Sequence, residues 1–418
     1  MKASRPFLLA SSISVVVLFM AACAAPPVEA PAIPTETAPA EVAVPVAPSP
    51  AAPPAAAAFA DAVARAGELL LREAQASHGA AHRDLVIDPL IDAATGQQTH
   101  ATVQMGAQLA GLITRRAPAW DVQTLTRSSL ASQPLLLIGT LTPVNSKGAR
   151  DENADVFRIC LALADLKTGK LVAKRADRAL GATVDAEPMP LYRDSPTWTL
   201  DATTRAYIQS CEAGEAGDAV APAYLQRLKA AAAINEAMIA YADNKTGDAY
   251  KLYGEARGLA APDDLRVLNG LYTTSWKTGR KKEAAETFDR IVGVGLDARR
   301  LPIKLFFTPG TTTLLQSGDL PAQYALWLHE VSTLMAARDT CLRVVGHTSR
   351  TGDPTANDVL SQKRAAVIKH SLERQNRKLA SRITADGVGS REILIGLGTD
   401  DARDALDRRV EFSVVDCR

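Results

Sequence analysis

A long segment that cannot fold determines how this chain is organised. Residues 24 to 58 hold ten of the 24 prolines, among many alanines, and offer almost no aromatic surface. Such a composition buries too little apolar area to offset the entropy of ordering, and its prolines keep the backbone extended. At about 3.1 Å per residue the segment reaches on the order of 100 Å. We therefore expect a tether, with folded structure beginning near Phe59.

Residues 1 to 23 have the features of a secretory signal. Lys2 and Arg5 precede an apolar run that ends in small residues directly before Cys23. The last four residues, MAAC, resemble the bacterial lipobox, with methionine where leucine is usual. The resemblance implies cleavage before Cys23 and several acyl chains there, which anchor firmly. Ala24, where an inner-membrane signal has aspartate, favours the outer membrane. The alternative is an ordinary signal peptide with an incidental cysteine.

Length and charge exclude several classes of protein. A chain of 418 residues with 47% hydrophobic residues divides into two to four domains. Its 47 basic and 46 acidic residues leave no field that would attract nucleic acid. After the signal, no apolar stretch approaches the roughly 18 to 20 residues that span a bilayer. We therefore expect the remainder to lie in the periplasm.

Four cysteines follow Cys23, and none has the spacing of metal ligands. In an oxidising compartment they allow three pairings. Because Cys160 and Cys211 lie in one region and Cys341 and Cys417 in another, we favour a disulfide within each region. We expect no structural metal and no cofactor.

Residues 59 to 211 mix helical and strand patterns. Helical spacing of apolar residues marks FADAVARAGELLLREAQ and THATVQMGAQLAGLITRRAP. Strands are indicated by LVIDPLID, by QPLLLIGTLTPV and by the hairpin VFRICLALADLKTGKLVAKRAD. The pattern predicts an α/β domain. Its order of elements resembles the periplasmic domains of the CsgG, FlgO and TolB N-terminal kind, which implies a protein partner.

Residues 222 to 298 are helical, and a short pattern within them is repeated. Ala249 and Tyr253 return 35 residues later as Ala284 and Phe288. This spacing resembles the tetratricopeptide repeat, in which the small residue lets two helices approach and the aromatic fills their groove. Two repeats are fewer than the roughly three needed for a free-standing stack. A generic helical bridge therefore remains the alternative.

Residues 303 to 418 alternate between strand and helix patterns. IKLFF and CLRVVGHT predict strands, and PAQYALWLHEVSTLMAARD predicts a long helix. Asp353 and Pro354 suit the start of a second helix, because Asp caps free amides and Pro fits the first helical position. The face expected toward the core is Leu360, Val367, Ile368 and Leu372. Arg364 shares that face, so we expect it to meet an anion or water at the sheet edge.

These residues resemble the OmpA-like peptidoglycan-binding domain, which implies a βαβαβ fold over residues 303 to 418. The matching positions are Gly346, Thr348, Ser349, Asn357, Leu360, Ser361, Arg364 and the closing strand from Arg408 to Phe412. The resemblance implies that Thr348, Ser349, Asn357 and Arg364 bind the diaminopimelate stem peptide of peptidoglycan. Arg364 would hold the carboxylate in its planar fork, and Asn357 would shape the turn or donate to the peptide.

Two positions depart from the family. FFTPGTTTLL lacks the aspartate that usually follows the paired phenylalanines, and the aspartate of the later turn is Ser349 here. A hydroxyl accepts a hydrogen bond from an ammonium group without neutralising it, so binding is expected to weaken about ten- to a hundredfold. Asp353 is an alternative source of charge, although its simpler role is the helix cap. Two interpretations stay open: an altered peptidoglycan site, or a domain kept as a scaffold for another partner.

Enzyme motifs are not found. His78 and His82 lie four apart, but Gly79 weakens a continuous helix between them and no third metal ligand is evident. Gly169-Lys170 lacks the long phosphate-binding loop. There is no G-x-S-x-G elbow and no cysteine in a catalytic context. We therefore expect no catalytic activity.

The sequence predicts a multidomain α+β chain with an N-terminal α/β domain, a helical repeat-like middle and a C-terminal OmpA-like domain. The function expected is that of an outer-membrane lipoprotein that associates non-covalently with peptidoglycan and presents partner-binding modules in the periplasm. The first alternative is an accessory or assembly factor of a secretion, flagellar or cell-wall synthesis machine. The second is a hydrolase with an unfamiliar site in the α/β domain.

Overall fold

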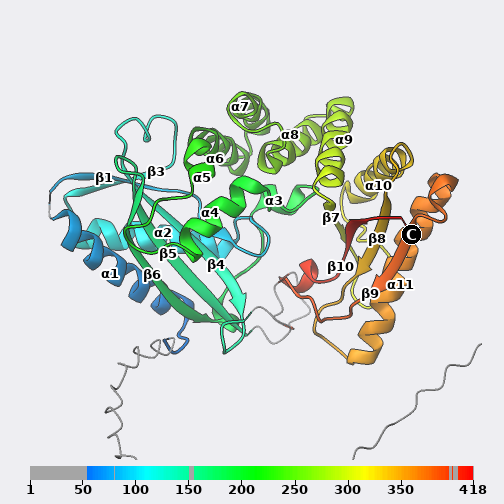
Figure 1. Cartoon of the computed structure of the whole chain (residues 1–418), viewed down its shortest axis with the longest axis horizontal. Coiled ribbons are helices and arrows are strands. Elements are labelled where there is room, and N and C mark those ends of the chain that lie inside the picture. The colour runs from blue at the N-terminus through cyan, green and yellow to red at the C-terminus, as the bar shows by residue number, and fades with distance from the viewer. Residues whose placement is uncertain (1–53, 80, 150–154, 395–397, 399–402, 418) are drawn as a thin grey trace, which may run out of the picture. The chain divides into compact units, whose positions relative to one another are not determined.

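The computed structural model describes residues 54–79, 81–149, 155–394, 398 and 403–417. These residues belong to one compact unit (Figure 1). The predicted signal, Cys23 and all but the last few residues of the predicted tether lie outside them. Within the described residues, none of the helices is long and apolar enough to cross a membrane.

The first part of the described chain is built on one mixed sheet. Its strands run in the order β3-β1-β4-β5-β6, and β2 pairs with β4. β1 is parallel to β3 and β4, whereas β4, β5 and β6 are antiparallel neighbours. The elements are α1 (Phe59–His78), β1 (Arg83–Ile87), β2 (Ile91–Asp92), α2 (His100–Arg116), β3 (Trp120–Thr124), β4 (Leu135–Val144), β5 (Val156–Asp165), β6 (Lys170–Leu180), η1 (Gly181–Thr183), α3 (Pro190–Asp194) and α4 (Ala202–Glu212).

The central strand β4 explains why this sheet is covered on both faces. All ten of its residues are buried, as a continuous apolar run requires. Leu135 and Leu137 pack with residues of α1 and α2, and Leu136 and Ile138 pack with residues of α4 and the helices that follow it. Figure 1 shows α1 and α2 together on one side of the sheet.

Two details differ from the sequence analysis. β3 was not predicted: WDVQT is only five residues long, and Trp120 is its one fully buried residue. The predicted tether also ends early. Ala57 forms a parallel bridge with Ala179 of β6, and its amide donates to the carbonyl oxygen of Arg178 at 3.0 Å. The chain just before α1 therefore already pairs with the edge strand β6 of the sheet.

Consecutive helices form the middle of the chain: α5 (Pro222–Gln226), α6 (Leu228–Ala242), α7 (Thr246–Leu259), α8 (Leu265–Lys277) and α9 (Lys281–Asp297). The repeated small and aromatic positions, Ala249, Tyr253, Ala284 and Phe288, are all completely buried. At Gly270, α8 lies close against α7, since a Cβ atom there would lie 2.2 Å from the Tyr253 ring. A glycine therefore does make room for an aromatic ring.

The last part is a four-stranded sheet with helices. Its elements are β7 (Arg300–Phe306), α10 (Leu320–Ala336), β8 (Cys341–Gly346), α11 (Pro354–Gln375), η2 (Arg377–Leu379), β9 (Ile383–Gly387), η3 (Arg403–Leu406) and β10 (Arg409–Val415). The strand order is β7-β10-β8-β9. β10 is antiparallel to β7 and β8, and β8 is parallel to β9. The predicted fold class, a multidomain α+β chain, is confirmed.

Direct contacts join this last sheet to the rest of the described chain. Thr197 forms an antiparallel bridge with Ile303 of β7. Beside it, the buried Lys304 ammonium donates to the hydroxyl of Ser195 at 3.1 Å and to the carbonyl oxygen of Tyr192. Burial lowers the pKa of Lys304 to about 7, although Asp194 opposes the shift. The junction at β7 is therefore a packed interface.

Candidate functional site

The predicted binding residues lie where β8 passes into α11. β8 ends at Gly346, and a Cβ atom there would lie 2.0 Å from the carbonyl oxygen of Ser361 in α11. Any side chain would force the strand and the helix apart. Glycine therefore lets the loop 347–353 and the first turns of α11 meet.

Two side chains fix this loop. Asp353 accepts a hydrogen bond from the Ala356 amide at 2.8 Å and so caps α11. The side-chain amide of Asn357 donates to the carbonyl oxygens of Thr351 at 3.0 Å and Ser349 at 3.4 Å. Of the two roles expected for Asn357, its contacts serve the shaping of the turn.

The Arg364 side chain is completely buried beneath the segment that follows β7. Its Nε donates to the carbonyl oxygen of Thr311 at 2.9 Å, and its Nη2 donates to that of Thr308 at 3.3 Å. Its Nη1 donates to the carbonyl oxygen of His347 at 3.0 Å. The guanidinium carbon lies 5.1 Å from the centre of the Phe307 ring, within cation–π range. Main-chain oxygens thus replace the water lost on burial.

The sequence predicted that Arg364 meets an anion or water at the sheet edge, and this stays a prediction. The sequence did not indicate that N–H groups of Arg364 reach carbonyl oxygens of three residues. A carboxylate ligand would compete with those oxygens for the same donors. The helix face differs as well, because Val367 is 40% exposed and Ala365 is buried in its place.

The remaining predicted binding residues are also shielded from solvent. Thr348 is 2% exposed and Ser349 is 5% exposed. The buried Thr348 hydroxyl has no hydrogen-bond partner within the described ranges. Asp353 caps α11 through Oδ1, which is the simpler of the two roles expected for it. A ligand ammonium group would meet a hydroxyl at Ser349.

Strand β10 places further charges beside the loop. Burial lowers the pKa of His347 to about 3, and the nearby Arg409 adds to the shift, so the imidazole is neutral. Burial would raise the pKa of Glu411, but nearby positive groups, with Arg409 first and Arg300 also contributing, together lower it to about 2. Arg409 Nε donates to Glu411 at 2.7 Å. This pair is internally compensated and adds no net charge to the site.

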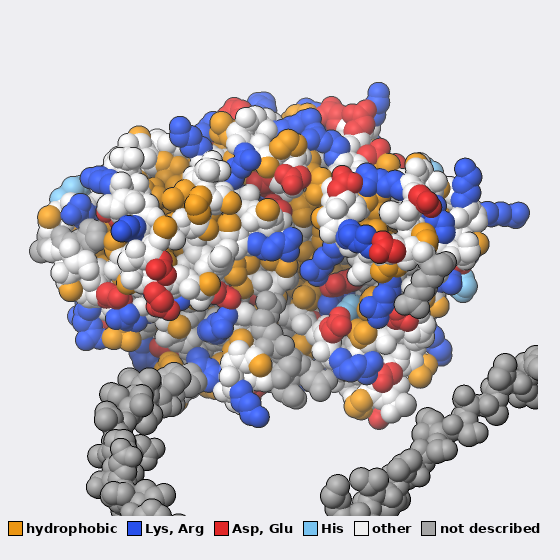
Figure 2. Space-filling model, in the orientation of Figure 1, with side chains coloured by type: hydrophobic (Ala, Val, Ile, Leu, Met, Phe, Trp, Pro, Cys, Tyr) orange, Lys and Arg blue, Asp and Glu red, His pale blue; other side chains and the backbone are white. Residues whose placement is uncertain are grey.

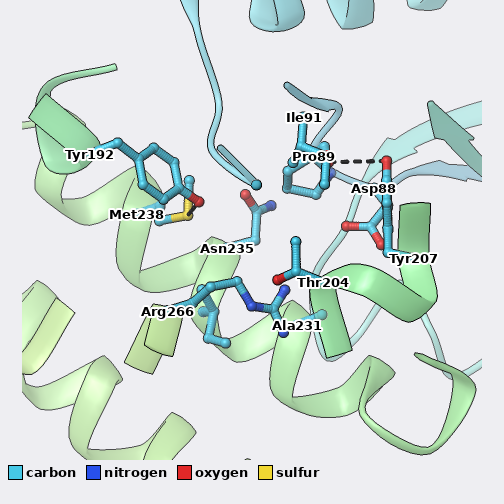
Figure 3. A pocket seen from close by; sticks show the side chains of 12 residues that line it. Asp88, Pro89, Ile91, Tyr192, Thr204, Tyr207, Ala231, Asn235, Met238 and Arg266 are labelled. Atoms are coloured by element: carbon cyan, nitrogen blue, oxygen red, sulfur yellow. Dashed lines mark hydrogen bonds between the residues drawn. The ribbon is translucent and has the colours of Figure 1, made fainter. Parts of the chain in front are cut away.

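A second polar centre, which the sequence analysis missed, lies between β1 and the helices α4, α6 and α8. Figure 3 shows Asp88, Thr204, Asn235 and Arg266 around a cavity of about 30 Å³. Such a volume holds about one or two water molecules. The Thr204 hydroxyl and Arg266 Nε are buried without a hydrogen-bond partner among the described residues. The cavity suits bound water better than a larger ligand.

The charged side chains that line this second centre are Asp88, which follows β1, and Arg266 of α8, which lies far from it in the sequence. Arg266 also pairs with its neighbour Asp264, whose carboxylate oxygen lies 3.3 Å from Nη2. Burial raises the pKa of Asp88 to about 6, against the hydrogen bond from the Tyr224 hydroxyl and the charge of Arg266. The sequence signal was Asp88, one of two acids in the otherwise apolar stretch LVIDPLID, which was interpreted only as a strand.

A larger cleft of about 300 Å³ lies near the junction at β7. Its lining includes Trp198 and side chains of both signs, among them Arg205, Asp263, Arg300 and Glu411. Figure 2 shows the same mixture over one face of the molecule, where Lys and Arg alternate with Asp and Glu. That face offers no extended basic patch for a polyanion.

Histidines give no strong metal site in the part of the chain that the structure describes. α1 ends at His78, so His78 and His82 do not share a helix. One group, His100, Asp185 and Glu187, has ligand atoms within 4.8 Å of one another. His100 Nδ1 lies 3.2 Å from Asp185, and both side chains are about half exposed, at 46% and 50%. Their pairing is that of an ordinary surface ion pair.

Disulfides link the four cysteines of the described chain. Cys160 of β5 is bonded to Cys211 of α4, and Cys341 of β8 is bonded to Cys417. Each bond thus closes a loop within one region of the chain. Cys23, the predicted lipidation site, lies outside the described residues.

Solved structures resemble part of this chain. The peptidoglycan-associated lipoprotein from Burkholderia pseudomallei is 21% identical, with 28% of this chain and 92% of that chain covered and a TM-score of 0.23. An outer membrane protein from Borrelia burgdorferi B31 is 23% identical, with 27% and 86% covered and a TM-score of 0.22. The LpoB C-terminal domain from Salmonella enterica is 13% identical, with 29% and 98% covered and a TM-score of 0.21. Among curated proteins, no relative matches the chain.

The family comparison concerns the region that contains Arg364. Residues 306–405 match the OmpA family. The match begins at the last residue of β7 and includes β8, the loop 347–353, α11 and β9. Residues 306–405 are therefore an OmpA family domain.

Proposed function

We propose that this protein is an outer-membrane lipoprotein that associates non-covalently with peptidoglycan through residues 303 to 418. The observation that carries the proposal is the OmpA family match over residues 306–405, which includes Arg364 on the buried face of α11. In the proposed complex, Arg364 holds the free carboxylate of diaminopimelate in the stem peptide, because a guanidinium fork matches a carboxylate. The loop 347–353 surrounds the ammonium end.

The N-terminal sequence supports the anchor. A lipobox-like MAAC stretch ends at Cys23, and the Pro-rich residues 24 to 58 follow it. Acyl chains on Cys23 hold one end of the protein in the membrane, while a tether of on the order of 100 Å gives the folded part access to the wall. The α/β domain and the helical middle, with its repeat-like positions, then serve as binding modules for a periplasmic protein.

A second function is favoured by the buried state of Arg364. Each of its three side-chain nitrogens already donates to a main-chain oxygen, and Ser349 supplies no carboxylate. In this second candidate the OmpA family domain is a scaffold, and the protein is an accessory factor of an envelope machine. Its partner binds the α/β domain or the helices, and Arg364 only stabilises the fold.

Co-sedimentation with isolated sacculi separates the two candidates. Detergent-extracted full-length protein is expected to sediment with sacculi, and Arg364→Met is expected to lower the bound fraction, since charged hydrogen bonds of about 1.5 to 3 kcal/mol change affinity about ten- to a hundredfold. Arg382→Met is the matched control. Arg382 also donates to main-chain oxygens, Met335 and Thr340 at 2.9 Å, but outside the loop 347–353.

The two candidate functions predict different sedimentation results. Loss of binding in Arg364→Met alone supports the peptidoglycan site. Equal sedimentation of both variants and the unchanged protein favours the scaffold. Labelled palmitate tests the anchor separately: incorporation is expected, and Cys23→Ser is expected to remove it. Absence of label from the unchanged protein would overturn the lipoprotein assignment.

A further inference from the structure

The segment after β7 folds back as a closed loop over α11. The Thr308 amide donates to the carbonyl oxygen of Thr313 at 3.0 Å, and the Leu315 amide donates to that of Phe306 at 2.8 Å. At the exposed tip, Gly310 has φ +66°, and a Cβ atom added there would have no neighbouring atom within 4 Å. These contacts give the loop, residues 307–315, a defined closed form.

Arg364 is the contact between this loop and the helix. Its Nε and Nη2 both donate to the loop, at the carbonyl oxygens of Thr311 and Thr308. Phe307, the first loop residue, covers the guanidinium. A guanidinium has only N–H donors, in one plane. A carboxylate approaching from the loop side therefore needs donors that the loop holds.

We propose that the loop 307–315 is an intramolecular competitor, which closes the wall-binding site until a carboxylate displaces it from Arg364. The inference rests on the proposed function and adds its regulation. Each carbonyl carries a partial charge, whereas a carboxylate carries a full one, so the ligand forms the stronger hydrogen bonds. Because only the open form binds, the apparent dissociation constant equals the intrinsic one divided by the open fraction.

A change at the loop tip tests this competition. Gly310→Ala adds a side chain in the left-handed region, which disfavours the closed loop by about five- to thirtyfold without a steric clash. The sacculus affinity of the full-length protein is therefore expected to rise by up to that factor. Gly217→Ala is the control, since Gly217 has φ +98°, is exposed and also has no atom within 4 Å. Its affinity is expected to stay unchanged.

Hydrogen exchange supplies a second readout. A free tripeptide ending in diaminopimelate is expected to accelerate exchange of the Thr308 and Leu315 amides, because binding opens the loop. A site that closes around its ligand would slow the same amides. Without ligand, Arg364→Met is also expected to accelerate them, since it removes the donors that hold the loop.

The outcomes distinguish this inference from the proposed function. Equal binding of sacculi by the Gly310→Ala and unchanged proteins would contradict the competing role of the loop 307–315 but not wall binding itself. Slower hydrogen exchange of the Leu315 amide on addition of the tripeptide would lead to the same conclusion. If neither protein binds above the level of Arg364→Met, wall binding and the competitor are overturned together. Tighter binding by Gly310→Ala, with faster exchange on tripeptide addition, supports both.

Discussion

The indole N–H of Trp327 in α10 donates to the hydroxyl of Tyr272 in α8 at 2.7 Å. The same hydroxyl donates to the side-chain oxygen of Gln323 at 3.0 Å. Phe288 of α9 stacks on Trp327, with ring centres 5.7 Å apart. The helical middle and the OmpA family domain therefore share one core, to which Tyr272, Phe288 and Trp327 all belong.

Tyr272→Phe is expected to destabilise the protein by about 1 to 3 kcal/mol, because it leaves the buried Trp327 donor without its acceptor. Urea denaturation measures the change. Tyr250→Phe is the control, since the Tyr250 hydroxyl donates to Glu283 at an exposed position, where a substitution costs about 0.5 kcal/mol or less. Equal effects of the two substitutions would contradict a shared core that depends on Tyr272.

Replacing either of two glycines in the helical middle by alanine is expected to change the stability of the protein, in opposite directions. Gly270→Ala places a Cβ atom 2.2 Å from the Tyr253 ring, and overpacking of this kind costs about 1 to 3 kcal/mol. Gly254 lies within α7 with no atom within 4 Å. Gly254→Ala should therefore stabilise the protein by about 0.5 to 1 kcal/mol. Thermal unfolding of both variants checks the pair, and a stabilising Gly270→Ala would refute the close helix approach.

The disulfides are expected to contribute measurably to stability. They close loops with sequence separations of 51 and 76 residues, and bonds of this kind typically add about 2 to 4 kcal/mol. Replacing Cys160 and Cys211 together by Ala should lower stability in denaturant by that amount. Mass spectrometry after alkylation of the denatured, unreduced protein should find these thiols unmodified. Alkylation of all four without reductant would contradict the pairing.

Asp88 is expected to make stability depend on pH. Its folded pKa, raised to about 6 by burial, exceeds the ordinary carboxyl value of about 4. The folded state therefore retains a proton that the unfolded chain loses, so this stabilisation is complete below about pH 4 and is lost as the pH rises through 6. The shift of about two units corresponds to about 3 kcal/mol.

Asp88→Asn tests this sign because an amide does not ionise. The stability of the variant relative to the unchanged protein should increase by up to about 3 kcal/mol between pH 4 and pH 7. Denaturant titrations at a series of pH values measure the difference. A difference that stays constant across this range would show that Asp88 does not titrate in the folded protein as its burial requires.

Local signals account for what the sequence predicted well. The apolar run of β4, the helical period of α1 and the Asp353 cap of α11 each depend on neighbouring residues. The short strands β3 and β9 were missed because WDVQT and ITADG are only five residues long and each has a single buried residue. Their pairing is decided by strands elsewhere in the sheet.

Long-range contacts account for what could not be predicted. Arg364 stood out as an arginine on an apolar face, but its loop partners lie 53 and 56 residues earlier. Lys304 interrupts the apolar run IKLFF, yet its partners Tyr192 and Ser195 belong to the segment beside the first sheet. Such residues signal that a polar partner must exist without identifying it.

Calorimetric titration of the full-length protein with a tripeptide ending in diaminopimelate tests the central claim most directly. The unchanged protein and Arg382→Met should bind with the same affinity, and Arg364→Met should bind about tenfold more weakly or worse. Binding that survives Arg364→Met without loss would contradict an Arg364-centred peptidoglycan site.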